Sequence, residues 1–553
     1  MQQTKCAALR VKVYSGMKNK SEVLTILKYV FAESMVLFAA IKNSNVGVLF
    51  VASLELIIIF SLFNISCDKI SKTMILLGND LVLLLFNIQM VVLAFSNSLI
   101  TMMMLTSFRS IEDIGGKKAI YITGLLVVFG ISLIPISKVR WINKRETNLI
   151  IFALFMLLFS CFRFGFGYSP FFGYSSLVDQ EFQNILVMKD VRNSKAVGRD
   201  FHKNEIEDSY GASFQRRNSS MPDKPNVILV MAEGLSQNII DDERGIMRHI
   251  KSMQDNSLSF RGYYNHTFAT YRGLIGQLSS GYQLSDLDTN TLTSMQSVFS
   301  GEGYDTVFIN TEPKNDDFIL YLNGLGFNKV INDDSKLSGF VNSISDKDAF
   351  KLLYNTAIEY NQKDTPFFIT IYTFGTHTSF DSPDKVFEDG EDAVLNRFYN
   401  LDYQFSKFMK KYKKSELVDN TIIIFTTDHA TYQDDSFNQA FPDYKRIHTE
   451  VDEIPLFIYH NNVITGHIDV GGRNSLDLAP TVFDFLDISA PNSFLGSSLF
   501  AEEAENEWEY CFTDSTEKYS TRNKNITKLE GDNLKEFETL LREYYATVRL
   551  ADK

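Results

Sequence analysis

The sequence predicts a multi-span α-helical membrane domain followed by an α/β domain with a mainly parallel central sheet. Long apolar runs are concentrated before residue 165 of the 553-residue chain, which is 45% hydrophobic overall. After residue 225, short β-branched runs alternate with helical patterns, which is typical of parallel strands joined by helices. We expect a transmembrane domain of about five helices at 1–165, a juxtamembrane helical arm and linker at 166–224, and the α/β domain at 225–553.

The membrane domain is predicted from apolar runs that each approach the roughly 20 residues a helix needs to cross the hydrocarbon core. They lie at 23–41, 46–66, 74–97, 119–137 and 149–165. The apolar segment Leu99–Leu105 leaves six spans as the alternative. No small-residue cleavage site follows Leu24, so we expect the first run to anchor the chain.

The loop charges predict the orientation. Eleven Lys and Arg lie in the segments that five spans place on one side, namely Lys5, Arg10, Lys12, Lys18, Lys20, Lys69, Lys72, Lys138, Arg140, Lys144 and Arg145. The alternate loops carry four, Lys42, Arg109, Lys117 and Lys118. The positive-inside rule then puts the N-terminus in the cytoplasm and, with five spans, the C-terminal domain outside. Six spans would reverse the C-terminal domain.

The soluble part is acidic, and it contains a single cysteine. The net charge of −13 and the lack of a basic tract argue against nucleic acid as a partner. Cys511 has no second thiol with which to form an intrachain disulfide outside the membrane half. The predicted strands are Val227–Met231, Thr306–Asn310, Phe367–Tyr372, Thr421–Thr426 and Pro455–Tyr459, with helices at 270–279, 348–361 and 395–413.

Polar residues follow three of these strands at the point where each strand ends. Glu233 follows the first strand, His377 the third, and Asp428-His429 the fourth. The carboxyl ends of parallel strands gather ligands, and carboxylates with imidazole can bind a divalent metal there. Thr270 begins a short helix, where free N–H groups favour a phosphate or an alkoxide. The alternative for Thr270 is an ordinary helix N-cap.

The ordered set of these residues resembles the alkaline phosphatase superfamily. It is most similar to the sulfatase-like, membrane-anchored branch of lipoteichoic acid synthases, phosphoglycerol transferases and phosphoethanolamine transferases. Supporting stretches are Leu325-Gly-Phe-Asn-Lys-Val-Ile, Ile454-Pro-Leu-Phe-Ile-Tyr and Ser475-Leu-Asp-Leu-Ala-Pro-Thr. The resemblance covers residues 225 to about 500, and the membrane anchor in outline. It implies an α/β alkaline-phosphatase-like (sulfatase-like) domain.

The resemblance also implies the roles of the site residues. Glu233, Thr270, Asp428 and His429 would hold one divalent ion, Mn²⁺ or Zn²⁺, which suits a site without thiolates. Thr270 would be the covalent nucleophile, because a bound metal activates a hydroxyl. His377 would contact the phosphate or the oxygens that attack and leave.

Further residues keep two interpretations each. His448 resembles the additional substrate-binding histidine of phosphoethanolamine transferases, or is a loop histidine. Arg272 is a candidate phosphate ligand, or caps its helix. We expect His460 and His266 to be structural. The stretch Thr270-Tyr-Arg-Gly lacks the Cys/Ser-x-Pro-x-Arg motif of sulfatases, so we do not expect sulfate ester hydrolysis.

The substrate headgroup is the least determined part of the prediction. Lipoteichoic acid synthases carry a Trp and an Arg where this chain has Asp316 and Phe318. The acidic pair Asp316-Asp317 suits a cationic group such as ethanolamine, or is simply a solvated loop.

We expect a metal-dependent transferase in the bacterial cytoplasmic (inner) membrane, with its catalytic domain extracellular or periplasmic. It would move phosphoglycerol or phosphoethanolamine from a membrane phospholipid, through a phosphothreonine-type intermediate, to a cell-surface glycan or lipid. The alternatives are an extracytoplasmic phosphodiesterase or phosphatase, and a non-catalytic surface scaffold of the same fold.

Overall fold

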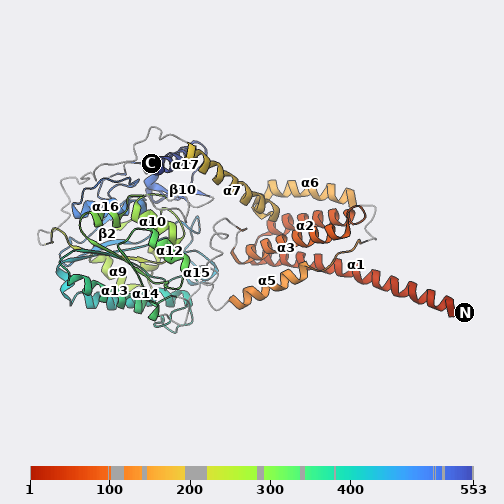
Figure 1. The fold of residues 1–553 in the computed structure, drawn as a ribbon, viewed down its shortest axis with the longest axis horizontal. Helices are drawn as coiled ribbons and strands as arrows, with labels where there is room; N and C mark the ends of the chain where they lie inside the picture. Colours follow the sequence, from red (N-terminus) through yellow and green to blue (C-terminus); the bar gives the residue numbers. More distant parts are fainter. Residues whose placement is uncertain are drawn as a thin grey trace. The chain divides into compact units, whose positions relative to one another are not determined.

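The computed structural model divides into two compact units, Met1–Leu186 and Val187–Lys553 (Figure 1). It describes residues 2–96, 99–100, 118–139, 146–193, 221–282, 292–336, 343–378, 381–501, 503–504, 506–513 and 517–550. The domain boundaries expected from the sequence stay a prediction.

The secondary structure of the first unit consists of helices joined by short turns and loops within its described residues. Its helices are α1 (Gln2–Lys42), α2 (Val46–Ser66), α3 (Lys72–Ser96), α5 (Lys118–Ser132), α6 (Glu146–Phe164), the 3-10 turn η4 (Phe166–Tyr168) and α7 (Pro170–Asn193), which continues into the second unit. Within the described part of the chain, four segments are long and apolar enough to cross a membrane, namely Lys20–Lys42, Val46–Ser66, Lys72–Phe95 and Glu146–Phe164. The chain is therefore a membrane protein.

The fourth expected span, 119–137, overlaps helix α5, whose described residues run from Lys118 to Ser132. Residues 101–105, on which the six-span alternative depends, lie outside the described residues. The number of spans therefore stays a prediction.

A buried lysine joins two of the membrane helices. The Lys28 ammonium on α1 donates to Asp80 Oδ1 (2.6 Å) and Asn79 Oδ1 (2.9 Å) on α3, and to the Ile134 carbonyl (3.0 Å). Three acceptors satisfy its three donors, which is how a charge becomes tolerable inside a membrane bundle. We interpret this cluster as a structural contact that stabilises the packing of α1 against α3.

The second unit is built on an eight-stranded sheet. Its strands are β1 (Asn226–Ala232), β2 (Leu258–Arg261), β3 (Asp305–Asn310), β4 (Lys329–Asn332), β5 (Phe367–Tyr372), β6 (Thr421–Thr427), β7 (Leu456–Tyr459) and β8 (Gly466–Asp469). The order is β4-β3-β5-β1-β6-β7-β2-β8. Only β7 runs antiparallel to its neighbours, β6 and β2. The predicted mainly parallel α/β fold is therefore confirmed.

Helices cover both faces of this sheet (Figure 1). One face carries α10 (Thr270–Ser279), α11 (Met295–Gly301), α12 (Asp316–Gly324) and α16 (Leu478–Leu486); the other carries α9 (Arg248–Asp255), α13 (Asp346–Asn361), α14 (Ala393–Tyr412) and α15 (Asp435–Ala440). The β1 residues alternate between the two cores, with Leu229 in one and Val230 in the other. A continuous apolar run is what a strand buried on both faces requires.

Smaller elements complete the second unit. They are α8 (Gln237–Ile240), the antiparallel sheet of β9 (Cys511–Thr513), β10 (Lys518–Ser520) and β11 (Thr527–Lys528), helix α17 (Gly531–Leu550), and the 3-10 turns η5 (Asp334–Lys336), η6 (Glu416–Asp419), η7 (Ser475–Asp477), η8 (Glu507–Tyr510) and η9 (Arg522–Lys524).

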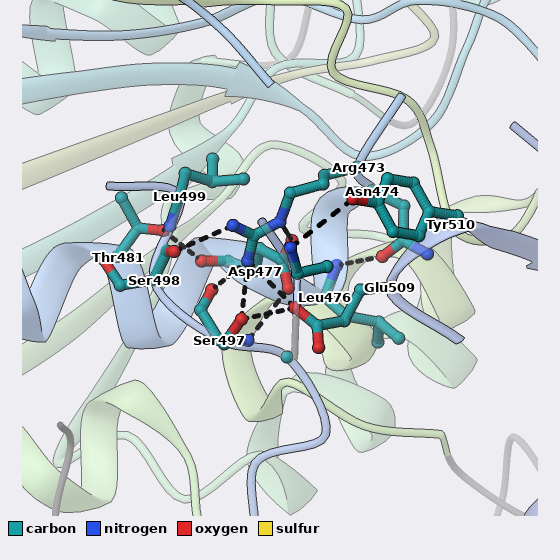
Figure 2. A network of polar contacts seen from close by, with 12 residues as sticks. Arg473, Asn474, Leu476, Asp477, Thr481, Ser497, Ser498, Leu499, Glu509 and Tyr510 are labelled. Atoms are coloured by element: carbon teal, nitrogen blue, oxygen red, sulfur yellow. Dashed lines mark hydrogen bonds and ion pairs between the residues drawn. The ribbon is translucent and has the colours of Figure 1, made fainter. Parts of the chain in front are cut away.

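A buried polar network fastens the chain after α16 to the start of that helix (Figure 2). Arg473 donates to Asp477 Oδ2 (2.8 Å), Glu509 Oε2 (2.9 Å) and the Ser498 carbonyl (2.9 Å). The Ser497 N–H donates to Asp477 Oδ1 (3.0 Å). The guanidinium and both carboxylates are therefore bonded in the interior, as buried charges must be.

Candidate metal and nucleophile site

Glu233 and Asp428 leave the sheet side by side. Strands β1 and β6 are parallel neighbours, and their register pairs Ala232 with Thr427. The next residue of each strand is therefore one of the two carboxylates. The Gly234 N–H donates to Asp428 Oδ1 (2.8 Å), which joins the two turns directly.

Glu233, Asp428 and His429 bring their polar atoms together in the interior. Each offers one ligand atom, and these atoms all lie within 4.8 Å of one another. His429 Nε2 lies 3.5 Å from Glu233 Oε1 and 3.4 Å from Asp428 Oδ2. All three residues are buried.

Hydrogen bonds engage one polar atom of Asp428 and one polar atom of His429. Asp428 Oδ1 accepts from the N–H groups of Gly234 and His429, whereas the buried Oδ2 accepts no hydrogen bond from any described residue. His429 Nδ1 donates to the Ala430 carbonyl (2.7 Å). This fixes the tautomer that leaves Nε2 as an acceptor, the usual arrangement of a metal-bound histidine. The residues therefore fit a divalent cation.

The electrostatics of the cluster also favour a cation. Burial raises the pKa of the Glu233 carboxyl, and the nearby Asp428 carboxylate raises it further. Burial alone would lower the pKa of His429, but Asp428 and Glu233 outweigh it, so the pKa is raised. Two carboxylates close together in the interior are costly without a positive charge between them, which a divalent ion supplies.

Thr270 is the first residue of α10. Its N-cap residue is Ala269, which has a φ of 77° and makes no side-chain cap. The Thr270 hydroxyl donates instead to Glu233 Oε2 (3.2 Å). The hydroxyl therefore meets the carboxylate cluster, and the strained residue before it sets the angle at which the helix begins.

Two residues of α10 hold this helix against the turn after β6. A Cβ added to Gly273 would lie 2.2 Å from the Asp428 carbonyl oxygen, so the contact requires glycine. Gln277 Nε2 donates to the carbonyls of Thr427 (2.8 Å) and Asp428 (3.0 Å). The helix that carries Thr270 is thus in direct contact with the backbone of Asp428, one of the candidate ligands.

The end of β5 contributes two side chains that the sequence did not single out. The Tyr372 hydroxyl donates to Glu233 Oε2, and Thr376 Oγ1 donates to the Glu233 carbonyl (2.5 Å). Together they orient the carboxylate and its turn. The only signal for Tyr372 was a hydroxyl at the end of a strand that is apolar apart from Thr370.

The other histidines have different surroundings. The His377 ring stacks on Phe374 with 4.9 Å between centroids. Burial lowers the pKa of His377 while the Glu233 carboxylate opposes the shift, so the two groups are within electrostatic reach. His448 Nε2 lies 3.2 Å from Glu517 Oε2, and within the described residues no hydrogen bond or ion pair joins it to the candidate metal ligands. His266 is buried against Ser475, and burial lowers its pKa to about 3.

The remaining candidates lie on α10 and α12. Arg272 is half-buried on the first turn of α10. Asp316 and Asp317 occupy the first turn of α12, where negative charge favours the helix dipole. Phe318 is buried and stacks on Tyr271 at 5.4 Å. The roles of all these residues, and of Thr270, His377 and the ligands, stay predictions.

The fold and these side chains define an α/β domain that carries a candidate divalent-metal site beside a hydroxyl group. Residues 225–488, just under half of the chain, match the family model described as Sulfatase, so this part of the chain is a sulfatase-like α/β domain. The chain matches no curated protein sequence.

Several solved structures are similar to this chain at low sequence identity. The integral membrane lipooligosaccharide phosphoethanolamine transferase A (EptA) from Neisseria meningitidis is 13% identical, with a TM-score of 0.52 over 86% of this chain and 97% of its own. An alkaline phosphatase superfamily protein from Vibrio parahaemolyticus is 16% identical, with a TM-score of 0.50 over 67% and 95%. The lipoteichoic acid synthase LtaP from Listeria monocytogenes is 18% identical, with a TM-score of 0.49 over 66% and 98%.

Proposed function

We propose that the chain is a membrane-anchored, metal-dependent transferase for substituted phosphate groups. It moves phosphoglycerol or phosphoethanolamine from a membrane phospholipid to a cell-surface glycan or lipid. The observation that carries this proposal is the Thr270 hydroxyl, which donates to Glu233 within a buried set of converging ligand atoms. The likeness in fold to a phosphoethanolamine transferase supports the class of reaction.

The proposed roles divide between a metal site and a substrate site. Glu233, Thr270, Asp428 and His429 hold the ion, Mn²⁺ or Zn²⁺. When bound, such an ion activates the threonine oxygen and neutralises charge on the phosphoryl oxygens. We assign His377 to the oxygens around phosphorus. Two residues outside the converging cluster are assigned to the substrate, His448 and Arg272.

The proposed reaction has two displacements at phosphorus. In the first, the Thr270 oxygen bonds to the phosphorus of the donor diester, and the bond to the diacylglycerol oxygen breaks. One net proton moves from Thr270 to the departing oxygen, and we assign its delivery to His377. In the second, an acceptor hydroxyl attacks the same phosphorus, the bond to Thr270 breaks, and the acceptor proton restores the threonine.

The membrane helices have a place in this scheme. The proposed position is the bacterial cytoplasmic (inner) membrane, with the catalytic domain extracellular or periplasmic. Tethering the domain to the bilayer raises the effective concentration of the phospholipid donor. A phosphodiesterase that uses water as acceptor is the second candidate, because the same first displacement serves both reactions.

The test is diacylglycerol release by the full-length protein in detergent, loaded with Mn²⁺ and given phosphatidylglycerol or phosphatidylethanolamine. We expect release from one of these lipids, and its loss in Thr270→Ala. Thr270→Ser is the matched control, because it keeps the hydroxyl. Free glycerol phosphate or phosphoethanolamine formed without an acceptor would identify the hydrolase, and release undiminished in Thr270→Ala would refute the nucleophile.

A further inference from the structure

Arg397 on α14 is a buried cation whose hydrogen bonding is incomplete. It is 1% exposed and is one of the two largest fully buried side chains. Its Nη1 donates to the Thr378 carbonyl (3.0 Å). Its Nε and Nη2 have no hydrogen-bond partner among the residues that the structure describes. A buried donor left unsatisfied is costly, so this pair of nitrogens needs an explanation.

The two open nitrogens form one edge of the guanidinium. An arginine edge with two parallel N–H groups matches two oxygens of a phosphate or carboxylate. Arg473 shows the contrasting case in the same unit, since its guanidinium donates to Asp477, Glu509 and main-chain carbonyls. Arg397 forms no ion pair with a described carboxylate. Its open edge therefore has the geometry of an anion-binding group, and no described carboxylate lies close enough to hydrogen-bond to it.

Arg397 lies in the surroundings of the candidate site. The segment Thr373–Thr378 carries His377. Two hydrogen bonds hold this segment between α14 and Glu233: Arg397 donates to the Thr378 carbonyl, and Thr376 donates to the Glu233 carbonyl. The charge of Arg397 interacts with four carboxylates, those of Asp434, Asp392, Glu233 and Asp381 in order of decreasing effect, and it also acts on His377. Burial lowers the pKa of Arg397 to about 10, so the guanidinium stays charged at neutral pH.

We propose that the Nε–Nη2 edge of Arg397 binds two oxygens of a substrate phosphate beside His377. This inference rests on the proposed function, because it assigns the recognition of a phosphate to that site. A phosphate at this edge satisfies both open donors in an interior where water does not compete for them. With 1% of the side chain exposed, we expect the phosphate to enter as the His377 segment shifts. The group recognised is carried either by the donor diester or by a phosphorylated acceptor.

The first experiment measures inorganic phosphate binding to the full-length, Mn²⁺-loaded protein by isothermal titration calorimetry. Arg397→Lys keeps the charge and one donor for the Thr378 carbonyl but loses the two-pronged edge. We expect it to weaken phosphate binding by about tenfold or more, as the loss of a charge-assisted hydrogen bond does. If Arg397→Lys folds poorly, Arg397→Met keeps the volume and removes the edge, and the same loss is expected.

Arg473→Lys is the matched control. It replaces another buried arginine, one that is fully bonded within the network of Figure 2. We expect it to lower the melting temperature and to leave phosphate affinity unchanged. Wild-type phosphate affinity in both Arg397→Lys and Arg397→Met would overturn the proposal.

A second measurement separates the two sources of the phosphate. It follows the covalent adduct on Thr270 by intact-protein mass spectrometry after incubation with phospholipid. If Arg397→Lys loses both phosphate affinity and the adduct, the edge binds the donor diester. If it loses phosphate affinity but keeps the adduct, the edge binds a phosphate of the acceptor. A wild-type protein that forms no adduct would refute the proposed function, while phosphate affinity would still decide the role of Arg397.

Discussion

Replacing Gly273 by alanine tests whether the contact between α10 and the turn after β6, which carries Asp428, sets the position of Thr270. The added Cβ would lie 2.2 Å from the Asp428 carbonyl oxygen, about 1.2 Å short of an ordinary contact at 3.4 Å. The helix must move back by about that distance. The bond from Thr270 to Glu233, now 3.2 Å, would then exceed hydrogen-bonding range. A displacement of about 1 Å costs about 100-fold in rate, and the crowding costs about 1–3 kcal/mol of stability.

The assay for Gly273→Ala is the initial rate of diacylglycerol release, together with Mn²⁺ affinity and urea unfolding. Gly301→Ala is the matched control, because it is also a helical glycine and a Cβ there meets nothing within 4 Å. We expect the control to keep its rate and to gain up to about 1 kcal/mol of stability. A Gly273→Ala protein that releases diacylglycerol at the wild-type rate would show that this contact does not position Thr270.

Three further substitutions test the supports of the site and one buried acid. Gln277→Leu removes both hydrogen bonds to the carbonyls of Thr427 and Asp428. We expect Mn²⁺ affinity to fall by about tenfold in a calorimetric titration. Unchanged Mn²⁺ affinity would show that Gln277 contributes only to packing. Tyr372→Phe removes the hydroxyl that donates to Glu233, and we expect Mn²⁺ affinity to fall by about tenfold here too. Unchanged Mn²⁺ affinity would show that this hydrogen bond does not support the metal site. Asp346→Asn tests the carboxyl whose pKa burial raises from 3.8 to about 7. The folded state keeps a proton that the unfolded chain releases, so the unfolding free energy should fall as pH rises from about 4 to 7, by about 1.4 kcal/mol for each pKa unit. Asp346→Asn should flatten that slope in urea unfolding at several pH values, and an unaltered slope would contradict the assignment.

The main strands were predictable because burial on both faces imposes continuous apolar runs. The five expected strands overlap β1, β3, β5, β6 and β7. Strands β2, β4 and β8 have four residues each and mix polar with apolar side chains, as in Leu258-Ser-Phe-Arg, so no pattern marked them. The antiparallel direction of β7 depends on strand pairing, which a single segment does not encode.

The candidate ligands were visible in the sequence because a carboxylate directly after an apolar strand is chemically conspicuous. The residues that position these candidate ligands could not be recognised from the sequence. Gln277 and Gly273 matter only because α10 contacts the turn after β6, about 150 positions further along the chain. The open edge of Arg397 likewise depends on its burial beside the His377 segment, and nothing in its local sequence indicates it. His448 lies against Glu517, a partner that local sequence could not predict.

The most direct test of a covalent intermediate on Thr270 is the intact mass of the Mn²⁺-loaded, full-length protein after incubation with phosphatidylglycerol or phosphatidylethanolamine, followed by peptide mapping. We expect one added phosphoglycerol or phosphoethanolamine group, located on Thr270, absent from Thr270→Ala, and lost again when an acceptor is supplied. Diacylglycerol release with no mass increase on Thr270 at any time during turnover, including after rapid acid quenching, would contradict it.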